Sequence, residues 1–163
     1  MKKNILIIDP ASKSLGWSWW QYGKLTEHGT ILANPNDPVH KRLLTIFNKL
    51  NLLFAKIKFD EVHIEQMNTR THRFCIWSVG MCYTCFGRVG FVADDINVTQ
   101  WKQHYGLKQK DKGDAIRVVF DRVFPNVVVK SDDEYESIMM GKFVMERKPP
   151  QAKPVKRRKK YGK

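Results

Sequence analysis

Apolar runs and helical repeats alternate along the chain. Five segments have the apolar character of strands, and they lie at residues 4–9, 15–22, 25–32, 62–65 and 95–98. The second and third are expected to form a hairpin, because turn-forming residues separate them at positions 22–24. The first segment is a continuous aliphatic run, which is typical of a strand buried on both faces of a sheet.

The remaining segments carry apolar residues at helical spacing. Helices are predicted within residues 34–58, over about 71–89, over 100–105, over 113–124 and from about 131 to 146. Thr99 is expected to cap the third helix, Pro125 to stop the fourth, and Ser131 or Asp132 to cap the last. A hairpin followed by strands that alternate with helices predicts an α/β protein with a mixed sheet and flanking helices.

Two carboxylates stand at the ends of predicted strands. Asp9 follows the run ILII, and Glu65 follows VHI. Ligands of such sheets gather at the carboxyl ends of the strands, so both side chains are expected at one edge. Asp133 and Glu136 are three residues apart in the last predicted helix and therefore share one of its faces.

Four carboxylates from three elements would repel one another strongly without a counter-charge. Mg²⁺ resolves such repulsion, because it prefers carboxylate oxygens and water as ligands. Two such ions, ~3.5–4 Å apart, can clamp the attacking and leaving oxygens of a phosphodiester. Asp111 and Asp114 are an alternative acidic pair, although their Lys-rich surroundings favour a role at a helix N-terminus instead.

The length and the cysteines limit the class of protein. At 163 residues the chain can form one domain whose core needs no cross-links. No apolar stretch reaches the roughly 20 residues of a membrane span, and the N-terminal apolar run is too short for a signal peptide. A cytoplasmic location is therefore expected. Three cysteines do not suggest a disulfide framework, and Cys82 and Cys85 are expected to be buried in a helix.

Positive charge is concentrated near the end of the sequence. The net charge is +13, and residues 147–163 hold nine Lys or Arg and no acid, which leaves +4 (13 − 9) for residues 1–146. We therefore expect a domain over residues 1–146 and a flexible basic tail over residues 147–163. The tail is interpreted as an arm that binds DNA phosphates, and its basic run is Arg157, Arg158, Lys159 and Lys160. A solubility tail or an import signal is the alternative.

Other segments are also candidates for contact with DNA. The basic stretch TRTHRF contributes Arg70, Arg73 and Phe74, and a later loop contributes Lys108, Lys110 and Lys112. Trp17 and Trp19 share one face of a strand and Trp20 the other, which favours core packing over base stacking. The histidines at positions 28, 40, 63 and 104 have no evident partners.

Four segments occur in order over about residues 4–145, namely IDPASKSLGW, FDEVHIEQ, DKGDAIRVVF and DEYESIMMG. Together they resemble the RuvC-type Holliday junction resolvases of the ribonuclease H-like superfamily. Four departures, together with the compactness of the chain and its basic tail, suggest a divergent, phage-type member. Ser137 stands where a small alanine is usual. Ala11 stands where glycine is usual, and Glu136 replaces the commoner aspartate. Met67 and Asn68 stand where an aromatic residue is usual, for which Phe74 is the candidate substitute.

The resemblance implies a ribonuclease H-like mixed β-sheet and a metal-dependent endonuclease that resolves four-way (Holliday) DNA junctions by paired symmetric nicks. It implies that Asp9, Glu65, Asp133 and Glu136 hold two Mg²⁺ ions, with Mn²⁺ as the expected substitute. It further implies that Lys112 acts near the scissile phosphate. Two nicks need two sites, so a homodimer is expected, with the apolar helix over residues 71–89 as its contact surface.

Two other functions stay open on the sequence. One is a related nuclease that acts on flaps, forks or RNA–DNA hybrids. The other is a non-catalytic protein that binds junctions through the same basic surface. The presence of all four carboxylates favours an enzyme over a binding protein.

Overall fold

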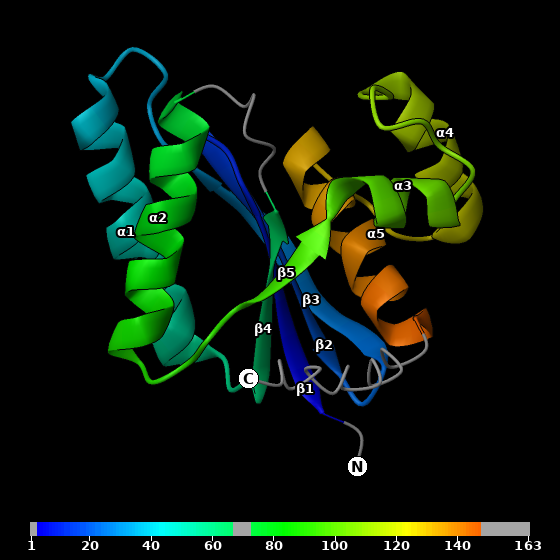
Figure 1. The fold of residues 1–163 in the computed structure, drawn as a ribbon, viewed down its shortest axis with the longest axis horizontal. Coiled ribbons are helices and arrows are strands. Elements are labelled where there is room, and N and C mark those ends of the chain that lie inside the picture. Colours follow the sequence, from blue (N-terminus) through cyan, green and yellow to red (C-terminus); the bar gives the residue numbers. More distant parts are fainter. Residues whose placement is uncertain (1–2, 67–72, 148–163) are drawn as a thin grey trace, which may run out of the picture.

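The computed structural model describes residues 3–66 and 73–147. Within them, five strands form one sheet in the order β3-β2-β1-β4-β5 (Figure 1). The strands are β1 (Asn4–Pro10), β2 (Ser14–Gln21), β3 (Lys24–Leu32), β4 (Glu61–Gln66) and β5 (Asp94–Asn97). The first three strands pair antiparallel to one another in order. Strand β4 pairs parallel to β1, and β5 pairs parallel to β4. The predicted strands, the hairpin and the mixed sheet are confirmed.

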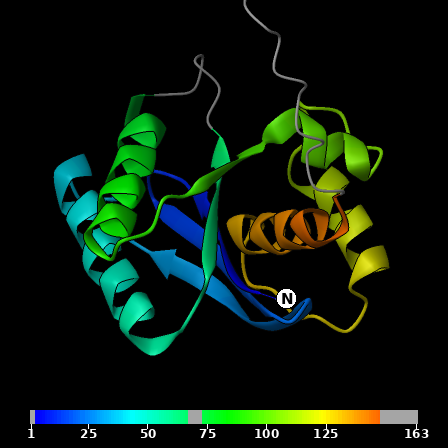
Figure 2. The same ribbon diagram turned by 60° about the horizontal axis from the view of Figure 1, so that its bottom comes forward.

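Helices cover both faces of this sheet. In the described residues they are α1 (Val39–Lys56), α2 (Arg73–Arg88), α3 (Val98–His104), α4 (Asp114–Val123) and α5 (Asp132–Glu146). The pair α1 and α2 lies on one face, while α3, α4 and α5 lie on the other, and the turned view shows the same division (Figure 2). No helix in the described part of the chain has both the length and the apolar character needed to cross a membrane.

The helix starts refine the predicted caps. Asn97, not Thr99, caps α3, because its side chain accepts a hydrogen bond from the backbone N–H of Gln100 at 3.2 Å. Asn97 also ends β5, so this strand passes directly into the helix. Ser131, one of the two candidates, caps α5 by accepting from the N–H of Glu134.

The sheet separates two apolar cores, and alternate residues of each strand enter different ones. Leu6 and Ile8 of β1 pack with α1 and α2, whereas Ile5 and Ile7 pack with α3, α4 and α5. The tryptophans of β2 divide as predicted. Trp17 lies in the first core and Trp20 in the second. Cys82 and Cys85 are free and buried, as expected.

The same alternation decides where the strand-end carboxylates point. In β4, Val62 and Ile64 belong to the core under α1 and α2. The register pairs Ile8 with Ile64 in parallel, so Asp9 and Glu65 follow one residue later on neighbouring strands. Both carboxylates therefore lie on the face that α5 covers.

Candidate active site

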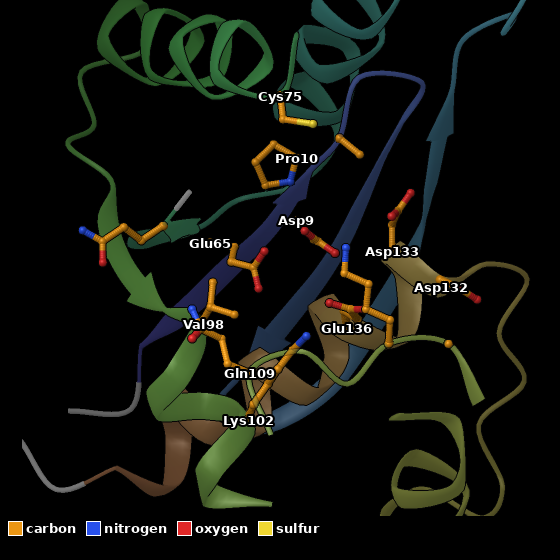
Figure 3. A pocket seen from close by; sticks show the side chains of 14 residues that line it. Asp9, Pro10, Glu65, Cys75, Val98, Lys102, Gln109, Asp132, Asp133 and Glu136 are labelled. Atoms are coloured by element: carbon orange, nitrogen blue, oxygen red, sulfur yellow. The ribbon is translucent and has the colours of Figure 1, made fainter. Parts of the chain in front are cut away.

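A cavity of about 500 Å³ opens at the carboxyl ends of β1 and β4, beside α3 and the first turn of α5. All four predicted carboxylates line it, namely Asp9, Glu65, Asp133 and Glu136. Figure 3 shows Asp9, Glu65 and Glu136 around one space, with Asp133 at its side. The structure thus brings together residues that are more than 120 positions apart in the sequence.

The two strand-end carboxylates are almost fully enclosed. Asp9 is 6 % exposed and Glu65 is 8 % exposed. Trp101 of α3 is fully buried, and its indole Nε1 donates to Glu65 Oε1 at 2.9 Å. This hydrogen bond fixes one carboxylate oxygen and leaves the other available to a ligand.

The helix carboxylates owe their position to a close approach of α5 to β2. Ser14 Oγ donates to Asp133 Oδ2. Gly16 lies directly below the same turn, and a Cβ at this position would stand 1.9 Å from the carbonyl oxygen of Asp133. Only glycine permits this contact between the backbones. Glu136 follows one turn later on the same helical face.

Mutual repulsion and burial perturb these acids in the absence of a cation. Burial, with the charges of Glu65, Glu136 and Asp133, holds the pKa of Asp9 well above its usual range. Burial, with the charge of Glu65 first among its neighbours, raises the pKa of Glu136 to about 7. Burial also raises the pKa of Glu65 and that of Asp133. Such a cluster favours the binding of positive charge.

Two lysines line the cavity with these acids. Lys112 was predicted, and it is an exposed loop residue. Lys102 of α3 was not predicted, and it is 3 % exposed. Its ammonium donates to the carbonyl oxygen of Asp111 at 2.8 Å, and its charge offsets part of the rise that burial and the other acids cause in the pKa of Asp9 and of Glu136. Its position on a short helix directly after a strand next to Glu65 is the signal that sequence reasoning missed.

The donor set suits a hard divalent cation, because every candidate ligand is a carboxylate oxygen. Among the described residues, however, no three His, Cys, Asp or Glu side chains are already arranged to hold one ion. Asp133 is engaged by Ser14, and Glu65 by Trp101. Ligation by all four therefore needs side-chain rotations within the cavity.

The alternative acidic pair does not line the cavity. Asp111 Oδ2 accepts from the backbone N–H of Lys108 at 2.8 Å, so this side chain stabilises its own loop. Asp114 lies in the first turn of α4, as the helix-terminus interpretation expects.

The other predicted DNA contacts are only partly described. Lys108 and Lys110 are exposed in the loop that ends at Lys112. Phe74 is half-buried, and its ring packs edge-on against Trp77 at 5.3 Å. Arg73 begins α2. Arg70 and the basic run Arg157, Arg158, Lys159 and Lys160 lie outside the described residues.

Three of the four histidines have acidic partners, contrary to expectation: His63 lies 3.6 Å from Glu61 Oε2 and 3.9 Å from Asp94 Oδ2, and the other two make closer contacts. His28 Nδ1 lies 2.6 Å from Glu134 Oε1, and His104 Nε2 lies 3.0 Å from Glu146 Oε2. The partners of His28 and His104 are far apart from them in sequence, so spacing alone gave no sign of these two contacts.

Comparisons with known proteins agree with this architecture. Among solved structures, Thermus thermophilus RuvC matches with a TM-score of 0.66 at 13 % sequence identity, over 85 % of this chain and 90 % of RuvC. The fold is that of RuvC. The structure of T. thermophilus RuvC in complex with a Holliday junction substrate gives the same values. This likeness confirms the predicted ribonuclease H-like α/β fold. No protein-family model matches the chain, and neither does any curated protein.

Proposed function

We propose that this chain is a Mg²⁺-dependent, structure-selective endonuclease that resolves four-way DNA junctions. The observation that carries the proposal is the shared cavity of Asp9, Glu65, Asp133 and Glu136 in a RuvC-like fold. RuvC itself has been crystallised with a Holliday junction substrate, which makes the same substrate the first candidate for this chain.

In this proposal the four carboxylates are the ligands of two divalent ions. When bound, such ions supply an activated water and offset the charge on the leaving oxygen of a phosphodiester. The protein's own contribution is positional. Trp101 orients Glu65, Ser14 holds Asp133, and the buried stem of Lys102 keeps an ammonium group next to the acids. Lys102 and Lys112 are suited to contact a non-bridging oxygen of the phosphate that the cavity receives.

The basic residues around the cavity are proposed to hold the DNA backbone. Lys108 and Lys110 extend the charge of Lys112 along one exposed loop. Arg73 and Phe74 begin α2, and Arg70 stands between β4 and α2 in the sequence. The tail over residues 147–163 is proposed as a further phosphate-binding arm, since each Lys or Arg that neutralises a phosphate adds salt-dependent affinity.

A homodimer is proposed because one cavity makes one nick. Helix α2 exposes Ile76 (47 %), Trp77 (48 %) and Tyr83 (38 %) on its outer side, while Phe86 on its inner side is fully buried. A helix that is apolar on more than one side is suited to a second packing partner. Two-fold pairing through this surface would supply the second active site, and it is the commonest symmetry of oligomers.

The decisive experiment is a nicking assay on a synthetic four-way junction with labelled strands. We expect paired nicks in Mg²⁺ or Mn²⁺ and none in EDTA. Asp9→Asn should abolish nicking but keep or tighten junction binding, because the substitution removes both a ligand and a repulsive charge. Asp111→Asn is the matched control, and it should nick at nearly the wild-type rate.

The same assay separates the other functions. Faster cleavage of a flap, a fork or an RNA–DNA hybrid than of the junction would assign the chain to a related nuclease. Tight junction binding without cleavage under any metal condition would indicate a binding protein. Nicking by Asp9→Asn at the wild-type rate would refute the metal site.

A further inference from the structure

A fifth carboxylate lies on α5, outside the cavity, and it is buried. Glu134 is 3 % exposed and follows Asp133 directly. His28 Nδ1 of β3 donates to its Oε1 at 2.6 Å. Its Oε2 accepts from the backbone N–H of Lys130 at 2.9 Å and from Thr30 Oγ1 of β3 at 3.4 Å. An enclosed carboxylate is costly without partners, and Glu134 has three.

The first turn of α5 is tied to β3 a second time through its cap. Ser131 Oγ accepts from the N–H of Glu134 at 3.2 Å, and the same hydroxyl is hydrogen-bonded to Thr30 Oγ1. Ser131 and Glu134 have the spacing of a capping box, in which the side chains of the cap and of the third helical residue bond back to the backbone. Here the side chains of Ser131 and Glu134 are also hydrogen-bonded to the sheet, Glu134 to His28 and Thr30, and Ser131 to Thr30.

These contacts determine how α5 is rotated about its axis. Successive residues of a helix are about 100° apart, so a glutamate that faces β3 places its predecessor toward β2. There Asp133 meets Ser14, and its carbonyl lies over Gly16. Glu136, three residues after Asp133, then faces the cavity. A different rotation would move both candidate ligands away from Asp9 and Glu65.

We infer that Glu134 is a positioning residue, which with His28 and Thr30 locks the rotation of α5 so that Asp133 and Glu136 face the cavity. The inference rests on the proposed function, and it extends the site to three residues that do not line the cavity. Partners that orient metal ligands typically change metal affinity or activity about 10–100-fold when they are removed. A cap that served stability alone would have no such effect.

The test compares Glu134→Ala, Glu134→Gln and Tyr105→Phe as full-length proteins. Glutamine keeps the acceptor for the N–H of Lys130 and can donate to a neutral His28, so it should largely restore the wild-type behaviour. Tyr105 Oη donates to the carbonyl of Met139 at 3.0 Å, farther along α5. Tyr105→Phe therefore removes one hydrogen bond to the same helix without touching its first turn.

Two readouts are measured below the melting temperature of each variant. The first is binding of Mn²⁺, followed by electron paramagnetic resonance of the free ion and by the rise in melting temperature. The second is the nicking rate at saturating junction. We expect Glu134→Ala to need at least about tenfold more Mn²⁺ for half-saturation. Its nicking rate should fall by at least about tenfold. Tyr105→Phe should change the melting temperature but neither of these readouts.

Unchanged Mn²⁺ binding and nicking in Glu134→Ala would overturn the inference, as would an equal loss in Tyr105→Phe. If Glu134→Ala does not fold, His28→Ala and Thr30→Val decide the matter in the same assays. A wild-type protein that binds Mn²⁺ but cleaves no DNA would refute the proposed function alone, because the Mn²⁺ comparison still decides the role of Glu134. A wild-type protein that neither binds Mn²⁺ nor nicks would refute both.

Discussion

Replacing Glu136 by glutamine should stabilise the metal-free protein while it destroys the activity. Burial and the neighbouring carboxylates raise the pKa of Glu136 from its ordinary 4.5 to about 7. The charged form is therefore disfavoured in the folded state. Glutamine has nearly the same shape but no charge, so it removes this cost together with the proposed metal ligand.

The pKa shift gives the size of the effect. Each unit of pKa corresponds to about 1.4 kcal/mol, so a rise from 4.5 to about 7 corresponds to about 3 kcal/mol at high pH. This is an upper limit, because nearby acids relax when one of them is removed. A raised carboxyl pKa means that the folded state binds more protons, so this contribution lowers stability as pH rises from 4.5 to 7. The gain in stability of Glu136→Gln over the wild type should thus be largest above pH 7.

Thermal unfolding in EDTA at pH 5 and pH 8 is the assay. For a domain of this size, 1 kcal/mol shifts the melting temperature by about 2–4 °C, so we expect a gain of up to about 10 °C at pH 8 and little at pH 5. Added Mg²⁺ should raise the melting temperature of the wild type and narrow the gap. If the variant melts below the wild type at pH 8 in EDTA, the claim that the charge of Glu136 destabilises the metal-free protein is refuted.

Glu146→Gln is the control on the same helix. Burial acts to raise the pKa of Glu146, but its hydrogen bonds with His104 and Lys142 outweigh burial and lower it. Its charge is therefore favoured in the folded state, and removing it should not raise the melting temperature at either pH. A gain as large as that of Glu136→Gln would mean that any loss of charge from α5 is stabilising.

Three further predictions follow from the proposed site, tail and dimer. Asp133→Asn should reduce nicking as severely as Asp9→Asn, whereas a larger loss in Asp111→Asn would move the metal site to the basic loop. Deleting residues 147–163 should reduce the salt dependence of junction binding by about 0.9 in log–log slope per lost phosphate contact and leave the rate per bound complex intact. An unchanged slope would show that the tail does not touch DNA. Trp77→Glu should give a folded monomer that never nicks in pairs, and sedimentation of the wild type as a single species near 19 kDa would refute the dimer.

The strands and helices followed from periodicity, because each has an apolar pattern that suits only one kind of structure. The continuous run before Asp9 required a strand buried on both faces, and β1 is the central strand of the sheet. The cap of α3 was misjudged for a local reason. A strand that runs straight into a helix leaves no loop to mark the boundary, and Asn97 serves both elements.

The site was predictable as far as residues are placed by secondary structure alone. Asp9 and Glu65 could be predicted from their positions at strand ends. Asp133 and Glu136 could be predicted from their i, i+3 spacing on one helix. Trp101 and Lys102 escaped notice because both are buried by tertiary packing against other elements. A lysine in a hydrophilic helix is normally taken as exposed, and only the fold places this one among four acids.

Two positions of the opening segment, Ala11 and Gly16, show where the fold tolerates a side chain and where it does not. A side chain is tolerated at Ala11, because its φ is not positive in the turn that its N–H closes with the carbonyl of Ser14. Gly16 is retained because a side chain there would collide with the backbone of Asp133. The turn after β1 therefore accepts a Cβ, whereas the contact between β2 and α5 does not. That contact carries Asp133 and, one turn later, Glu136 to the cavity. The backbone of the helix is therefore fixed there, and only the length of the side chain at position 136 sets how far its carboxylate reaches into the cavity.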